Sequence, residues 1–157
     1  MQQNCWFRRS KMKILYVEDE EVKAKEVLDV LNNKGIIDFR KSLNSGLAVI
    51  QEEIFDLILL DMSLPLYDYS SVDENENDFE TFAGIDILEE LDRKGRDDKV
   101  VIITAFDVLG EGENEITMVQ LDEKLQEEYE NVYLGLIYYD SSSLEWRRSL
   151  QKLLEEL

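Results

Sequence analysis

The chain has 157 residues and a formal net charge of −19, and it contains one cysteine and no histidine. A hydrophobic content of 44% beside 34% charged residues is typical of a globular domain with a real core, and no apolar run approaches the ~20 residues that span a bilayer. The absence of histidine excludes Ser-His-Asp catalysis and His-ligated zinc, and the acidic balance argues against direct nucleic-acid binding.

The N-terminal segment and the single cysteine indicate the cellular compartment in which the protein is expected. Residues 1–10 contain no apolar stretch that could serve as a signal peptide, and Cys5 has no partner for an intrachain disulfide. We therefore expect a cytoplasmic protein that does not associate with membranes. Because Met12 would be a natural start for the domain, we expect residues 1–11 to be a flexible extension and residues 12–157 to be a single domain.

The first half of the chain alternates short apolar runs with helical patterns. Continuous aliphatic runs of four to six residues are typical of strands buried on both faces of a parallel sheet. The expected elements are a strand at 14–17, a helix at 20–33, a strand at 36–40, a helix at 45–53 and a strand at 57–60. The apolar positions of the first helix are Val22, Val27, Leu28 and Leu31.

The second half continues the same alternation. Its expected elements are a helix at 84–94 with Ile85, Leu88 and Leu91 facing inward, a strand at 100–104, a helix at 116–129, a strand at 132–138 and a helix at 144–157. Strands that alternate with helices indicate an α/β protein with a doubly wound, five-stranded parallel sheet.

Three of the predicted strands end in groups that carry chemistry. The first is followed by Glu18 and Asp19, the third by Asp61, and the fourth ends in Thr104. Open α/β sheets place their sites at the carboxyl ends of the strands, so we expect these groups to meet at one edge. Carboxylates and a hydroxyl so arranged predict a site for a divalent cation and a phosphoryl group.

With these residues in this order, the chain resembles the receiver domain of two-component response regulators. The matching motifs are Glu18-Asp19, the segment 59–65 (Leu-Leu-Asp-Met-Ser-Leu-Pro), the helix that begins at Gly84, and Thr104-Ala105. The resemblance runs from about Lys11 to the C-terminus. It implies the flavodoxin-like (β/α)5 receiver fold.

The resemblance also implies a role for each site residue. Asp61 is the candidate phosphoacceptor, because a carboxylate can attack phosphorus to form an acyl phosphate. Its negative charge opposes that attack, so a cation must neutralise the carboxylate and the phosphoryl oxygens, and Mg²⁺ suits a site with few carboxylates. The other expected Mg²⁺ ligands are Asp19 directly, Glu18 through water and the backbone carbonyl of Ser63. The expected hydrogen-bond donors to the phosphoryl group are the Thr104 hydroxyl and the N–H groups of Met62 and Ala105.

One element departs from the family pattern. Receivers carry a lysine, usually followed by proline, at the end of the fifth strand, where its ammonium contacts the phosphoryl group. Here that position falls at Tyr139, or at Tyr138 if the register shifts by one, and Asp140 replaces the proline. A tyrosine supplies no positive charge, which predicts weaker stabilisation of the transition state and a weaker link between phosphorylation and loop movement.

Two connections are longer than those typical of the family, at 66–83 and 106–115. Both leave the edge of the sheet that carries Asp61, and loops of such length tend to be functional or disordered. The first contains six acidic residues and no basic one. Two interpretations remain open for it: a mobile acidic insertion, or a partner-selecting flap with the contact residues Tyr67, Tyr69, Phe79 and Phe82.

Three functions from different classes fit the sequence. The leading hypothesis is a stand-alone, non-enzymatic receiver that a histidine kinase or phosphotransfer protein phosphorylates on Asp61, and that signals to an unidentified output protein by protein contacts, with a homodimer as one option. The alternative is a pseudo-receiver, a binding module that works without phosphate. The third is a phosphatase of the haloacid-dehalogenase type, but its Asp-x-Asp motif is absent, because Met62 and Ser63 follow Asp61.

Overall fold

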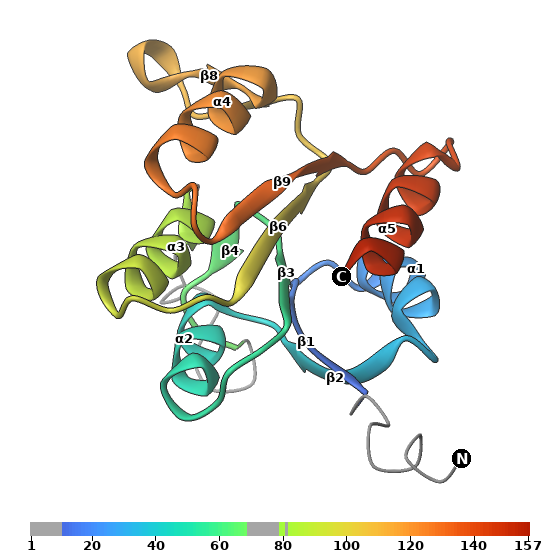
Figure 1. Ribbon diagram of the computed structural model, residues 1–157. Coiled ribbons are helices and arrows are strands. Elements are labelled where there is room, and N and C mark those ends of the chain that lie inside the picture. Colours follow the sequence, from blue (N-terminus) through green and yellow to red (C-terminus); the bar gives the residue numbers. More distant parts are fainter. Residues whose placement is uncertain (1–10, 69–78, 81) are drawn as a thin grey trace, which may run out of the picture.

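A computed structural model describes residues 11–68, 79–80 and 82–157. Its centre is a parallel five-stranded sheet in the order β2-β1-β3-β6-β9 (Figure 1). The strands are β1 (Met12–Val17), β2 (Gly35–Arg40), β3 (Leu57–Leu60), β6 (Lys99–Thr104) and β9 (Tyr133–Tyr138). The predicted doubly wound, flavodoxin-like α/β architecture is thus confirmed.

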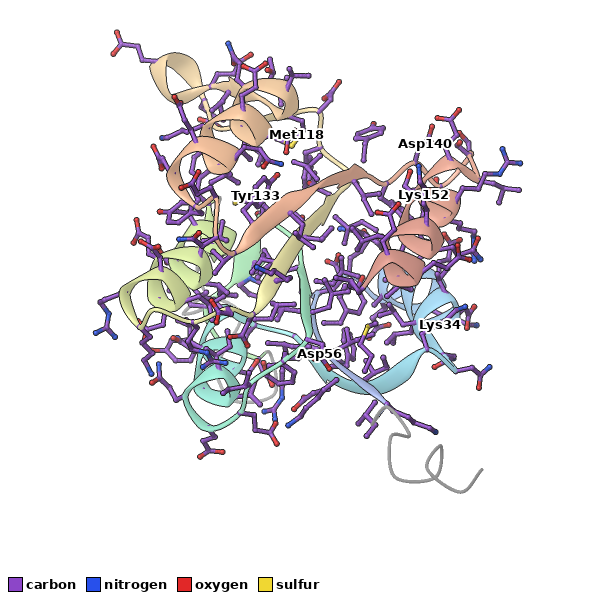
Figure 2. All side chains as sticks on the ribbon, in the orientation of Figure 1. Lys34, Asp56, Met118, Tyr133, Asp140 and Lys152 are labelled. Carbon is purple, nitrogen blue, oxygen red and sulfur yellow. The ribbon has the colours of Figure 1, made fainter. Side chains whose placement is uncertain are left out.

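Helices cover both faces of the sheet. They are α1 (Glu21–Leu31), α2 (Leu43–Glu52), α3 (Ala83–Arg93), α4 (Met118–Glu128) and α5 (Glu145–Glu156). One face packs against α1 and α5, and the opposite face packs against α2, α3 and α4 (Figure 1). Figure 2 shows side chains filling the space on both sides, including Tyr133 between β9 and α4, whose hydroxyl donates to Asp122 at 2.6 Å. Within the described part of the chain, no helix has the length and apolar character needed to cross a membrane.

The alternation of side chains along β1 explains why the sheet has two cores. Leu15 and Val17 contribute to the core under α2, α3 and α4, whereas Ile14 and Tyr16 contribute to the core under α1 and α5. Successive residues of a strand point to opposite faces, so a run that is apolar throughout must be covered on both sides. All four of these side chains are fully buried.

The strand order places a topological switch point between β1 and β3. The chain leaves β1 toward α1 on one face, and after β3 it reaches α3 on the other face. Ligands of open α/β sheets bind in the crevice where neighbouring connections diverge in this way, at the carboxyl ends of the strands. The groups that follow Val17 and Leu60 therefore occupy the position that the fold favours for a site.

The phase of α1 differs from the predicted one. The buried positions are Lys23, Ala24, Val27, Val30 and Leu31, whereas Val22 is 66% exposed. Val22, one of the apolar positions named for this helix, therefore lies outside the core, because the helix turns the neighbouring Lys23 toward the sheet. In α3, Leu88 and Leu91 are buried as predicted, but Ile87 is also fully buried, and Ile85 is only partly buried at the margin of the core.

The two long connections leave short antiparallel pairings beside the main sheet. In the first, β4 (Leu64–Pro65) pairs with β5 (Phe79–Glu80). The predictions for residues 69–78 and 81, including Tyr69, lie outside the described residues, and so do those for residues 1–10. In the second, β7 (Val108–Leu109) pairs with β8 (Ile116–Thr117) around the short helix η2 (Gly112–Asn114). The helix expected from residue 116 begins instead at Met118, because Thr117 caps it by accepting from the Gln120 N–H.

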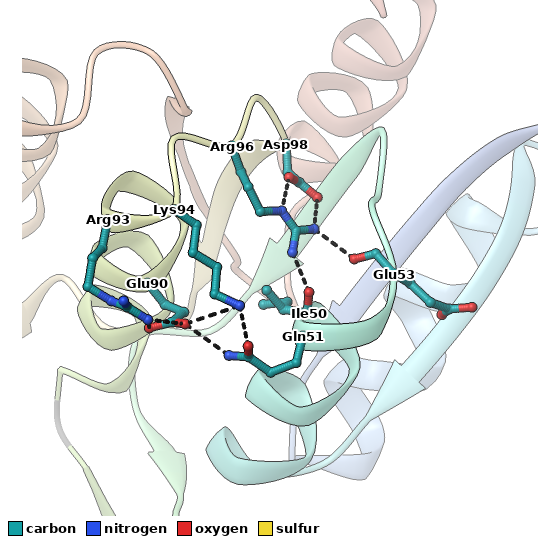
Figure 3. A network of polar contacts seen from close by, with 8 residues as sticks. All are labelled: Ile50, Gln51, Glu53, Glu90, Arg93, Lys94, Arg96 and Asp98. Carbon is teal, nitrogen blue, oxygen red and sulfur yellow. Dashed lines mark hydrogen bonds and ion pairs between the residues drawn. The ribbon is translucent and has the colours of Figure 1, made fainter.

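A polar network holds the amino-terminal edge of the sheet (Figure 3). The Arg96 guanidinium donates to both carboxylate oxygens of Asp98, from Nε at 2.8 Å and from Nη2 at 2.7 Å. The same guanidinium donates to the carbonyls of Ile50 and Glu53 at the end of α2. Because Asp98 directly precedes β6, this network ties α2 to the start of that strand, at the edge opposite Asp61.

Candidate functional site

Three carboxylates converge where β1 and β3 end. One oxygen from each of Glu18, Asp19 and Asp61 can be chosen so that all three lie within 4.8 Å of one another. Glu18 is fully buried and Asp61 is 6% exposed, while Asp19 lies at the margin. The hydrogen bonding between β1 and β3 extends to these acids, because the Asp61 N–H donates to the carbonyl of Val17 at 3.2 Å. The fold therefore brings the predicted acids together.

Glu18 is held by the backbone that leads into α1. Its Oε2 accepts from the N–H groups of Asp19 at 3.2 Å and Glu20 at 3.3 Å. Its Oε1 is buried and accepts no aligned hydrogen bond from the described residues, and its partner is an ammonium 2.5 Å away. Burial raises the pKa of Glu18 to about 7, with Asp61 adding to the rise and Lys23 opposing it.

Asp61 is oriented by its own neighbour. The N–H of Met62 donates to Asp61 Oδ1 at 2.8 Å, which leaves Oδ2 facing the other charged groups. Burial, followed by the negative charge of Asp61, raises the pKa of Asp19. Burial is the larger cause of the raised pKa in both Glu18 and Asp19, and the negative charge of Asp61 adds to it, so a cation placed among these carboxylates would be stabilised.

Lys23 is the site residue that the sequence analysis missed. Its side chain is 1% exposed, and its Nζ lies 2.5 Å from Glu18 Oε1, 3.4 Å from Asp61 Oδ2 and 2.8 Å from the carbonyl oxygen of Ile103. The ammonium therefore contacts groups carried by β1, β3 and β6 together. The signal was available in the helical period, because Lys23 stands four residues before Val27 and shares its buried face.

Thr104 ends β6 beside this ammonium. Its side chain is fully buried, and its Oγ1 accepts from the Phe106 N–H at 3.2 Å. The preceding carbonyl, that of Ile103, is the one that accepts from Lys23. The expected roles of Ser63 and Ala105 involve their backbone groups, and they stay predictions.

Tyr139 follows β9 on the face that packs against α1 and α5. It is 6% exposed, its ring packs against Trp146, and its hydroxyl donates to Glu26 Oε2 at 2.6 Å. Burial, together with this hydrogen bond to Glu26, raises the pKa of the phenol, which keeps it uncharged. The Lys23 ammonium lies 5.9 Å from the centre of the Tyr139 ring. The tyrosine thus lines the space beside a cation that another element provides.

The donor set fits a hard divalent cation. Among the residues that the structure describes, the three carboxylates have one ion-paired ammonium, so two negative charges stay uncompensated within this set if all three acids are ionised. Glu18 Oε1 accepts no aligned hydrogen bond from the described residues, and each of the three acids would offer a carboxylate oxygen as its ligand atom. Oxygen ligands with excess negative charge suit Mg²⁺, which is bound through a few carboxylates plus waters.

Comparison with solved structures agrees with this architecture. The chemotaxis response regulator CheY4 of Vibrio cholerae superposes with a TM-score of 0.60 at 15% identity, over 92% of this chain and 99% of that one. The receiver domain of the Francisella response regulator 1452 gives a TM-score of 0.59 at 16% identity, over 92% and 94% of the two chains. The chain has the receiver fold. The resemblance to receiver domains is thereby confirmed at the level of the fold.

Two curated proteins are similar along nearly their whole length. The uncharacterized protein y4jR of Sinorhizobium fredii is 29% identical over 146 residues, which are 89% of this chain and 95% of that protein. The Detocs response regulatory protein DtcB of Enterobacter cloacae is 28% identical over 151 residues, which are 93% of this chain and 100% of that protein. No family model matches the chain.

Proposed function

We propose that this receiver accepts a phosphoryl group on Asp61 in the presence of Mg²⁺ and signals through protein contacts. The observation that carries the proposal is the convergence of Glu18, Asp19 and Asp61 within 4.8 Å, at the switch point of a receiver fold. DtcB, a relative of matching length, is itself named as a response regulatory protein, which supports a signalling role.

The chemistry is the transfer of a phosphoryl group from a donor atom to a carboxylate oxygen. A carboxylate oxygen of Asp61 attacks the phosphorus of the donor, the bond from phosphorus to the donor oxygen or nitrogen breaks, and its electron pair leaves with the donor. The N–H of Met62 holds the Asp61 carboxylate at 2.8 Å, and Thr104 offers a buried hydroxyl at the end of the neighbouring strand. Glu18, Asp19 and Asp61 would hold Mg²⁺, which when bound neutralises the carboxylate and phosphoryl oxygens.

A phosphohistidine donor must come from another protein. The chain contains no histidine, so a phosphohistidine can reach Asp61 only from a partner such as a histidine kinase or a phosphotransfer protein. The edge that carries the site is also where β4 and β7 leave the main sheet, so a partner docked at Asp61 would meet these two ribbons. We propose that they contribute to partner choice.

Intact-mass measurement after incubation with acetyl phosphate and Mg²⁺ tests the proposal. We expect the mass to rise by one phosphoryl group in the wild type, with no rise when Mg²⁺ is chelated and none in Asp61→Asn. Asp56→Asn is a matched control, because Asp56 lies in the connection before β3, at the opposite edge of the sheet. Labelling that persists in Asp61→Asn would refute the assignment of the nucleophile.

The pseudo-receiver remains the second candidate, and the tyrosine at position 139 is the observation that favours it. A receiver that lacks the lysine after its last strand would, on this reading, bind its partners without phosphate. Absence of any mass gain, combined with unchanged partner capture by Asp61→Asn, would favour this candidate over the first.

A further inference from the structure

The cation missing from position 139 has a counterpart elsewhere in the chain. Lys23 reaches the site from the first turn of α1, and its ammonium is fixed by the Ile103 carbonyl at 2.8 Å and by Glu18 Oε1 at 2.5 Å. Its third neighbour, Asp61 Oδ2, is 3.4 Å away, which is longer than a normal charged hydrogen bond. An ammonium has three donors, and among the described residues the hydrogen bond that it donates goes to the Ile103 carbonyl, while both carboxylates are ion-pair neighbours and Asp61 is the more distant of the two.

We infer that Lys23 is the catalytic lysine of this receiver: it donates a hydrogen bond to the phosphoryl group on Asp61, the contact that Tyr139 cannot make. The inference rests on the proposed function and deepens it. A phosphoryl oxygen attached to Asp61 would lie within reach of an ammonium that is already 3.4 Å from that carboxylate. The lysine needs no large movement, because its other two contacts hold it in place.

The placement also gives Lys23 a route to the rest of the fold. The Ile103 carbonyl that it binds belongs to the residue before Thr104, at the end of β6. A phosphoryl group that draws the ammonium toward Asp61 weakens its hold on this carbonyl. The backbone beside Thr104, and the connection toward β7 that follows it, would then respond to phosphorylation.

A purely structural role makes a different prediction. If Lys23 serves only as an internal counter-ion for Glu18 and Asp61, its removal leaves two buried carboxylates without their partner and disturbs the site as a whole. Both Mg²⁺ binding and phosphoryl transfer would then suffer. If Lys23 acts on the phosphoryl group, removing it should weaken transfer but strengthen Mg²⁺ binding, because one competing positive charge leaves the site.

The test compares Lys23→Met with Lys25→Met, an exposed lysine on the same helix that serves as the matched control. We expect Lys23→Met to slow labelling by acetyl phosphate about ten- to hundredfold, the usual range for one charge-assisted contact. Its affinity for beryllofluoride, a phosphoryl mimic, should fall with the rate, its Mg²⁺ affinity should rise, and Lys25→Met should match the wild type in all three. Circular dichroism in urea checks that each variant is folded.

Relocating the lysine sharpens the result. The double variant Lys23→Met/Tyr139→Lys should recover part of the lost rate, whereas Tyr139→Lys alone should not accelerate labelling, since the ammonium of Lys23 already occupies the place. A folded Lys23→Met that labels as fast as the wild type overturns the inference, as does faster labelling by Tyr139→Lys alone. A loss of both Mg²⁺ and beryllofluoride binding in Lys23→Met assigns a structural role instead. A wild type that neither labels nor binds beryllofluoride refutes the proposed function itself, and the inference with it.

Discussion

Replacing Asp98 by alanine should destabilise the chain strongly without affecting the candidate site. The Asp98 side chain is fully buried, and its carboxylate accepts from two nitrogens of Arg96 and from the Phe55 N–H at 2.8 Å. Removing one partner of a buried ion pair typically costs about 3–5 kcal/mol. The Arg96 side chain is 13% exposed and keeps its two carbonyl partners, so we expect the low end, about 3 kcal/mol.

Urea unfolding followed by circular dichroism measures this loss, and a thermal scan should show the midpoint falling by about 6–12 °C for a domain of this size. Arg93→Ala is the control in the same network (Figure 3), because the Arg93 side chain is 69% exposed and its pair with Glu90 is a surface contact. Such pairs contribute under about 1 kcal/mol. If Asp98→Ala costs no more than Arg93→Ala, the buried pair does not hold the edge of the sheet. Labelling of Asp61 should be unchanged in both variants.

Three further outcomes follow from the site and the core. Mg²⁺ at ~100 times its dissociation constant should stabilise the wild type by about 2.7 kcal/mol in a thermal scan, and the shift should shrink sharply in Asp61→Asn. Gly84→Ala should lower the free energy of unfolding, measured in urea, by about 1–3 kcal/mol, because its Cβ would lie 2.7 Å from the Leu60 side chain. An unchanged urea midpoint would contradict this packing. Tyr139→Phe should cost about 1 kcal/mol in the same assay through the lost bond to Glu26, and equal labelling rates would show that the phenol takes no part in transfer.

The fold could be predicted from sequence because its strands carry an unambiguous pattern. The runs that became β1, β3 and β6 are apolar on both faces, and only a covered parallel sheet hides such strands. Their last residues then met at one edge because parallel strands end on the same side. Glu18, Asp19 and Asp61 were therefore placed correctly by chain order alone.

Lys23 was not identified from the sequence as a site residue, because a search for hydrophobic periodicity counts lysine as a surface residue. The apolar positions named for α1 included Val22, which is exposed, and left out Lys23, which is buried. The helical period places Lys23 on the buried face, but it does not show that an ammonium is tolerated there, because the carboxylate and carbonyl partners come from other elements. The ribbon of β7 and β8 was missed for a related reason, since strands of two residues are too short to show a period.

The position of Lys23 changes what the tyrosine at 139 implies. The ammonium is in contact with Glu18 after β1, Asp61 after β3 and the Ile103 carbonyl of β6. Both α1 and Tyr139 pack on the same face of the sheet, and the ammonium lies 5.9 Å from the tyrosine ring. If Lys23 acts as inferred above, the positive charge comes from α1 instead of from the residue after β9. A receiver that lacks lysine after its last strand should therefore be judged by the charges that its neighbouring helix brings to the phosphoacceptor.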